Sequence, residues 1–86
     1  MTIIKHNGWT LHYTIGSVVA APVKVGDEVL DFRGDKLIVR GGTSPHKVGS
    51  AGYVDVTEPG NAHVGRYYAT VIGAKWINDE TGGHGA

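Results

Sequence analysis

The residues best suited to chemistry lie in one polar, glycine-rich segment, "RGGTSPHKVGSAGYV", at positions 40–54. Glycines let backbone N–H groups approach a ligand closely, serine hydroxyls donate hydrogen bonds, and lysine and histidine supply positive charge. Together these groups are the parts of an anion-binding concavity. The segment therefore predicts a site for a ligand or a protein partner. Its candidate residues are Arg40, Ser44, His46, Lys47 and Ser50, joined by an outward-facing tyrosine, Tyr68.

The same segment also fits a solvent-exposed loop that only connects two strands. A hairpin connection needs about two to five residues, and Thr43–Gly52 is about twice that length. Long loops in small domains are more often functional than short ones. From the sequence alone, the connecting loop and the binding loop both stand as interpretations.

Catalytic motifs are incomplete in this chain. A phosphate-binding loop needs Gly-Lys-Ser/Thr in succession before a helix, whereas Lys47 is separated from Ser50 and a strand follows. Ser50, a histidine and Asp55 would be the candidate triad, but no strand-to-helix elbow surrounds the serine. We therefore expect no enzymatic activity.

Metal-binding motifs are also missing from the sequence. The chain has five histidines and no cysteine, and the histidines form neither an HxH nor an HExxH cluster. His6 and His12 could face each other across the Asn7-Gly8 turn, but without further local ligands. We therefore expect no metal and no cofactor.

The tripeptide Arg33-Gly34-Asp35 matches an adhesion motif, but it also forms an ordinary turn. Glycine supplies a positive φ there, and the aspartate can bond its own backbone. Asp31 and Arg33 lie on one side of an extended segment. We therefore expect a local ion pair at this turn.

Composition limits the class of protein. The 86 residues suffice for one small domain, which buries a modest share of its surface, so we expect a homo-oligomer. Eight basic and eight acidic residues give zero net charge, which disfavours nucleic-acid binding. No long apolar run is present, so we expect neither a signal peptide nor a membrane span, and the absence of cysteine suits a cytoplasmic location.

Short apolar runs separated by glycine turns predict an all-β fold. Asn7-Gly8 predicts a hairpin of residues 2–6 and 9–15, and residues 16–22 form an edge segment or a connector. Residues 23–77 predict an SH3-like five-stranded barrel, with at most a 3₁₀ turn near 70–72 and a flexible tail at 79–86. The hairpin is then an addition to the barrel within one domain, 1–78. The predicted core contains Val29, Leu37, Val39, Val54, Val56 and Ile72.

Aromatic residues give two further expectations. Tyr67 and Tyr68 are neighbours on a strand, so one should point inward and one outward, where it could serve as a binding platform. The hairpin side chains Trp9, Leu11 and Tyr13 would form the surface for self-association.

Three motifs give the chain a resemblance to a family of small, functionally uncharacterised proteins of tailed phages and prophages. These motifs are a DFRG turn, a PHK loop that leads into a Ser-x-Gly strand entry, and a tyrosine-rich VIG segment. The resemblance covers residues 25–77 and implies a phage or prophage origin, without implying any chemistry. The matching residues are Asp31, Phe32, Arg33, Gly34, Pro45, His46, Lys47, Ser50, Gly52, Tyr67, Tyr68, Val71, Ile72 and Gly73.

The sequence therefore favours a non-enzymatic phage or prophage accessory protein in the host cytoplasm, which binds a phage or host protein through its loops. The alternative is a homo-oligomer that sequesters a small anionic ligand such as a nucleotide, as a counter to host defence. Arg40, His46 and Lys47 would supply the charge in that case.

Overall fold

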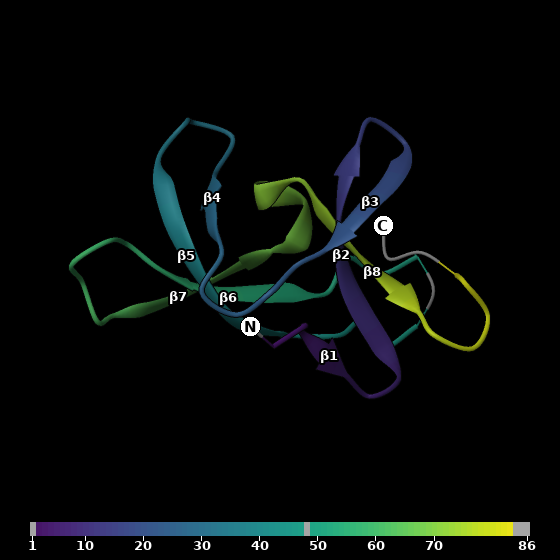
Figure 1. Ribbon diagram of the computed structural model, residues 1–86. Coiled ribbons are helices and arrows are strands. Elements are labelled where there is room, and N and C mark those ends of the chain that lie inside the picture. The colour runs from purple at the N-terminus through teal and green to yellow at the C-terminus, as the bar shows by residue number, and fades with distance from the viewer. Residues whose placement is uncertain (1, 48, 84–86) are drawn as a thin grey trace.

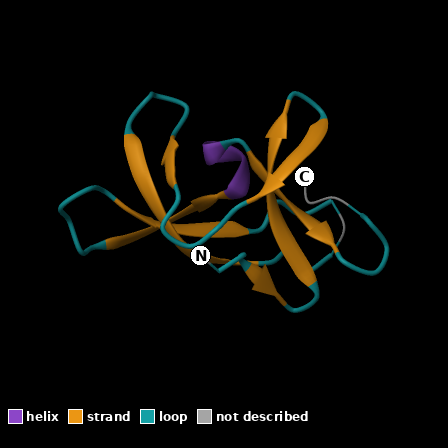
Figure 2. Cartoon of the chain, in the orientation of Figure 1, coloured by secondary structure: helices purple, strands orange, loops and turns teal. Residues whose placement is uncertain are grey.

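The computed structural model describes residues 2–47 and 49–83, and its fold is all-β, as predicted (Figure 1). Short strands are joined by turns, and the one helical element drawn in Figure 2 is a single 3₁₀ turn. The elements are β1 (Lys5–His6), β2 (Trp9–Ile15), β3 (Val18–Pro22), β4 (Glu28–Leu30), β5 (Lys36–Thr43), β6 (Tyr53–Thr57), β7 (Val64–Tyr68), η1 (Ala69–Ile72) and β8 (Ala74–Asn78).

The strands form two antiparallel sheets. One has the order β4-β5-β6-β7, and in the other β2 pairs with β1, β3 and β8. Both sheets are open in the described part of the chain. The all-β class is therefore confirmed, but a closed five-stranded SH3-like barrel is not.

The N-terminal hairpin turns where predicted and joins the second sheet. Asn7 and Gly8 have φ values of 50° and 81°, as a two-residue turn of this kind requires. Beyond the turn, β2 pairs with β8, with Leu11 opposite Trp76. The hairpin is therefore built into the fold instead of being added to it, because β8 needs β2 as its hydrogen-bonding neighbour.

The proposed self-association surface on this hairpin is wrong. Trp9 is 7% exposed and Leu11 is fully buried, so both belong to the core. An alternating strand pattern marks a buried face, but it does not tell whether β8 or a second subunit covers that face.

Residues 18–22 form an edge strand, the first of the two alternatives that the sequence allowed. Ile15 pairs with Val18 across the Gly16-Ser17 turn. Pro22 ends β3, where its missing N–H costs no central hydrogen bond.

All six predicted core residues are buried. The core also contains residues outside that predicted set, and Trp76 is the largest of the fully buried ones. These additional members are Ile4, Trp9, Leu11, Val23, Ala69, Ala74 and Trp76.

The expectation for the two neighbouring tyrosines holds for only one of them. Tyr68 is exposed, at 56%, but Tyr67 is also exposed, at 39%, instead of buried. Their strand, β7, is the last strand of its sheet among the described residues. Phe32 is also exposed. It lies in the turn after β4, with the Arg33 guanidinium 5.6 Å from its ring centroid.

The turn at residues 31–35 carries the predicted ion pair. A side-chain nitrogen of Arg33 lies 3.5 Å from Asp31 and 3.6 Å from Asp35. Burial acts to raise the pKa of Asp31, but backbone hydrogen bonds from Asp35 and Arg33 and the Arg33 charge together hold it below the ordinary value. The tripeptide is therefore a closed local turn.

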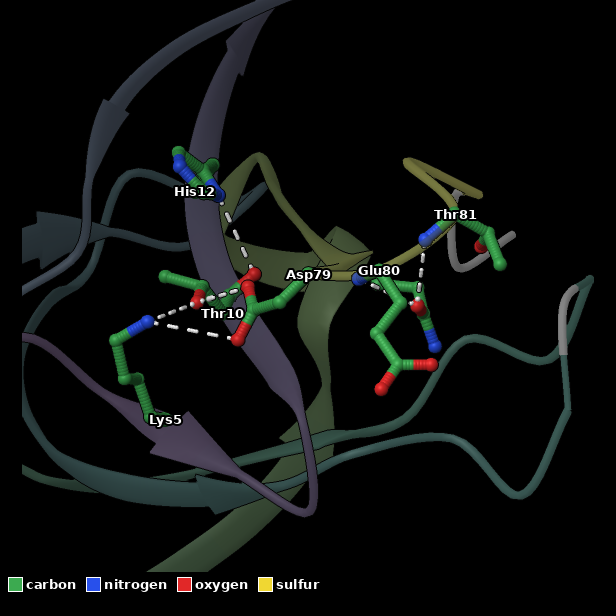
Figure 3. A network of polar contacts seen from close by, with 7 residues as sticks. Lys5, Thr10, His12, Asp79, Glu80 and Thr81 are labelled. Carbon is green, nitrogen blue, oxygen red and sulfur yellow. Dashed lines mark hydrogen bonds and ion pairs between the residues drawn. The ribbon is translucent and has the colours of Figure 1, made fainter.

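The start of the C-terminal tail is tied to the hairpin (Figure 3). Thr10 donates a hydrogen bond of 2.6 Å to Asp79, and Lys5 lies 3.5 Å from the same carboxylate. Asn78 accepts the backbone N–H groups of Glu80 and Thr81. The tail predicted as flexible is thus hydrogen-bonded as far as Gly83, and residues 84–86 lie outside the described residues.

Candidate binding pocket

A pocket of about 330 Å³ lies between the 44–52 loop and the adjoining ends of β6 and β7. This volume is at the lower end of the range of small-molecule sites, about 300–1,000 Å³. The walls combine hydroxyl groups, two tyrosine rings and small apolar side chains. The lining residues are Thr43, Ser44, Pro45, His46, Ser50, Ala51, Gly52, Tyr53 and Tyr68.

Four of the six sequence-predicted site residues line this pocket: Ser44, His46, Ser50 and Tyr68. Arg40 and Lys47 are not part of the lining. The β5–β6 register shifts between Val39 and Gly41, and Arg40 within that shift donates a hydrogen bond of 3.1 Å from Nε to Thr57. The pocket wall is therefore less cationic than the sequence predicted.

The near end of the loop is held by a histidine from the distant hairpin. The backbone N–H of Ser44 donates to Nδ1 of His6 at 3.1 Å, and the Ser44 hydroxyl oxygen lies 2.7 Å from the same nitrogen. A nitrogen that accepts an N–H carries no proton, so the neutral His6 ring holds its proton on Nε2. The hydroxyl is then also a donor to Nδ1.

A serine hydroxyl that donates to an imidazole resembles a nucleophile and its base. Here the His6 lone pair is already shared with the Ser44 backbone N–H. Among the described residues, no side chain bonds to Nε2 to orient the ring. Asp55, the acid of the triad considered from sequence, pairs instead with Arg66 at 3.1 Å. We therefore interpret the His6–Ser44 pair as a support for the loop.

Trp76 in β8 does not line the pocket itself, but it packs against two lining residues, Gly52 and Tyr53. Its indole N–H donates to the Tyr53 carbonyl at 3.2 Å. Gly52, with φ 69°, lies so close that an added Cβ would be 2.5 Å from the indole ring and 3.0 Å from Pro45. A glycine at position 52 is therefore required for the loop to lie flat on the tryptophan.

One wall of the pocket is an aromatic pair. The Tyr53 and Tyr68 rings stack with centroids 5.2 Å apart and planes 22° apart, because the two residues are opposite each other in the β6–β7 register. The Arg66 guanidinium lies 5.7 Å from the Tyr53 ring centroid. Such a surface can hold a flat or apolar group by stacking.

Sequence reasoning missed His6, Trp76, Tyr53, Pro45, Thr43 and Ala51 at this site. For Tyr53, its place at a strand start beside the loop could have suggested a role. For His6 and Trp76 no local signal exists, since both reach the pocket through pairing between distant segments. His12, which we placed opposite His6, instead has its Nδ1 3.2 Å from the Thr10 carbonyl oxygen.

Within residues 2–47 and 49–83, no three His, Asp or Glu side chains gather in a way that could hold a metal ion. No helix in this part of the chain is long and apolar enough to span a membrane.

Comparison with known proteins gives no relative for this chain. No protein-family model, no curated protein and no solved structure matches it.

Proposed function

We propose that the protein is a non-enzymatic accessory protein of a phage or prophage, and that it binds an extended segment of a protein partner in the 44–52 pocket. The observation that carries this proposal is the lining: hydroxyl groups and stacked tyrosines, with His46 as its only basic side chain. Such a wall suits a peptide, whose backbone accepts hydrogen bonds while an apolar side chain contacts the rings. The host cytoplasm is the proposed location.

Rigidity supports this proposal. His6 holds the first residue of the loop, and Trp76 supports Gly52 at its other end. Pocket residues that are already held in place lose little conformational freedom when a ligand binds, so more of the contact energy appears as affinity.

The test is a selection of random peptides displayed against the immobilised protein. Tyr68→Ala removes one ring of the pocket, and Ala51→Trp fills it. Tyr67→Ala and Ala62→Trp are matched controls, because neither residue lines the pocket. We expect enriched peptides to lose binding to the first two variants and to retain it with the controls. The proposal would be contradicted if no peptide were enriched, or if the enriched peptides bound Tyr68→Ala as well as wild type.

A small anionic ligand such as a nucleotide is the second candidate. The Tyr53–Tyr68 stack with Arg66 beside it favours a base-stacking site. The positions of Arg40 and Lys47 away from the lining weaken it, because phosphate binding relies on such cations. Native mass spectrometry with nucleoside mono- and triphosphates distinguishes the two candidates: a salt-sensitive bound nucleotide would favour the second.

For the fold, we propose that the two sheets correspond to an SH3-like barrel. Strands β4 to β7 form a meander, η1 follows, and β8 returns to the other sheet beside β2. An experimental structure in which β8 leaves β2 and extends the β4–β7 sheet would contradict this assignment.

A further inference from the structure

Strand β7 is an unprotected sheet edge. It follows β6 as the last strand of its sheet, and the loop between the two projects from the body of the molecule at the left of Figure 1. The other edges of the described sheets are shorter or blunted: β1 has two residues, β4 has three, β3 ends in Pro22, and β8 carries Lys75. Natural proteins usually protect an edge of this length, but β7 contains neither a proline nor a lysine.

The backbone of β7 presents hydrogen-bonding groups to its open side. Ala69 donates to the Gly52 carbonyl, and residues 69 and 52 continue the β6–β7 register. Bonded and non-bonded pairs alternate along an antiparallel ladder, so Tyr67 and Gly65 bond to β6. The N–H groups of Val64, Arg66 and Tyr68 therefore point away from β6, as do the carbonyls of Val64 and Arg66. The Tyr68 carbonyl is instead used by the 3₁₀ turn, because Tyr68 is the N-cap of η1 and an N-cap carbonyl accepts the first hydrogen bond of the helix.

We propose that a second copy of this chain occupies the edge, with the two β7 strands antiparallel about a two-fold axis through Arg66. In this register, the Arg66 N–H of each copy donates to the Arg66 carbonyl of the other. Each Tyr68 N–H donates to the Val64 carbonyl of the other copy. Four backbone hydrogen bonds form, and the β4–β7 sheets of the two copies become one continuous sheet.

The side chains in this register are self-complementary. Val64 and Tyr68, which are 51% and 56% exposed, lie opposite each other twice, and β-branched and aromatic residues form favourable cross-strand pairs. The two Arg66 side chains also meet, but each forms an ion pair of 3.1 Å with Asp55 of its own copy. The order of charges across the axis is therefore one carboxylate, two adjacent guanidinium groups and one carboxylate.

This pairing also places a residue beside each binding pocket. Tyr68 lines the pocket, so Val64 of the second copy lies opposite a pocket residue. This dimer requires no ligand, and its test is independent of what the pocket binds.

The test compares two substitutions at one position by sedimentation at about 100 μM, a concentration that populates weak dimers. Arg66→Pro removes the outward N–H without removing a β6–β7 hydrogen bond. Arg66→Thr keeps the N–H and removes the like-charge contact. We expect a dimer for wild type, a monomer for Arg66→Pro and a dimer at least as tight for Arg66→Thr. A monomeric wild-type protein, or a dimer that Arg66→Pro leaves intact, would overturn the proposal.

A disulfide provides a second measurement that does not depend on the proline variant folding. The chain has no cysteine, so a single Arg66→Cys substitution reports only on this contact. Opposed residues of a bonded antiparallel pair have Cα atoms about 5.5 Å apart, within disulfide range. Mild oxidation should cross-link Arg66→Cys much faster than Val18→Cys, a control at another exposed strand. Equal cross-linking rates would contradict the pairing.

Discussion

The Nδ1 atom of His6 accepts the backbone N–H of Ser44 at 3.1 Å and lies 2.7 Å from the Ser44 hydroxyl oxygen. This contact joins the N-terminal hairpin to the first residue of the binding loop, across 38 positions of sequence. The hairpin thus contributes to the core, through Leu11, and holds a residue of the pocket wall in place, through His6. Loss of the His6–Ser44 contact would therefore disturb the loop more than the two sheets.

Replacement of His6 by alanine leaves the Ser44 N–H and hydroxyl without their acceptor. Ser44 is 6% exposed, and an unsatisfied buried donor costs about 1–3 kcal/mol. We expect a loss of that size in the free energy of unfolding, measured by urea denaturation. His6→Asn offers an oxygen acceptor near the Nδ1 position and should restore part of the loss. Equal stability of His6→Ala and wild type would show that Ser44 has another partner.

Two adjacent glycines in β5 should respond differently to alanine. A Cβ on Gly42 would lie 2.6 Å from the Tyr53 carbonyl oxygen and 2.8 Å from Trp76, whereas a Cβ on Gly41 would meet nothing within 4 Å. We expect Gly42→Ala to destabilise the protein by about 1–3 kcal/mol through overpacking. Gly41→Ala should change the melting temperature little. Similar melting temperatures for the two variants would show that the Trp76 ring does not lie against Gly42.

Truncation of Leu11 in the hairpin, compared with truncation of Leu37 in β5, tests whether the hairpin is part of the core. Leu11 is fully buried and Leu37 is 4% exposed. Truncation of either to alanine should cost about 2–5 kcal/mol, because each leaves a cavity. Trp9→Ser combined with Leu11→Ser should then unfold the protein. If the double variant instead stayed folded and changed only its oligomeric state, the hairpin would be a subunit interface, as we expected from the sequence.

Local sequence rules predicted the local features of the fold. Asn7-Gly8 forms its turn because both residues accept positive φ. The 3₁₀ helix covers 69–72, close to its expected place, and ends at Gly73 in the left-handed conformation. Alternation identified the five predicted core residues that lie in strands, since period-two burial depends only on the strand's own geometry. The sixth, Ile72, is buried from the 3₁₀ turn η1.

Contacts between distant segments were beyond these rules. The pairing of Leu11 with Trp76 and the bond of His6 to Ser44 depend on which strands meet. Arg40 missed the pocket because a register shift after Val39 changes where its side chain points. Glycine inside a strand often marks such an irregularity, but Gly41 and Gly42 do not by themselves show where the Arg40 side chain points.

Asp79 should give the protein an acid-sensitive stability. The Thr10 hydrogen bond first, and the Lys5 charge next, hold the pKa of Asp79 below its ordinary value. A carboxylate whose pKa is lower in the folded than in the unfolded state stabilises the fold at pH values above its unfolded-state pKa, which is about 3.9. This contribution is lost as the pH falls through the folded-state pKa. Urea midpoints should therefore fall as the pH drops below about 4.

The variant Asp79→Asn isolates this effect. It should lower stability at neutral pH and reduce the acid-dependent loss, while the part due to Asp31, whose pKa is also lowered, stays. Asp31→Asn is the companion variant and should remove the other part. If Asp79→Asn has the same pH dependence as wild type, the Thr10–Asp79 bond contributes no stability in solution.

The most direct measurement of the central claim is the affinity of a selected peptide for three proteins: wild type, Tyr68→Ala and Tyr67→Ala. Tyr68 stacks on Tyr53 and lines the pocket, whereas Tyr67 is its exposed neighbour outside the lining. By isothermal titration calorimetry, we expect Tyr68→Ala to weaken binding by about tenfold or more, or about 1.4 kcal/mol. Tyr67→Ala should leave the affinity nearly unchanged. Equal affinities for all three proteins would contradict the claim that the pocket beside the 44–52 loop is the binding site.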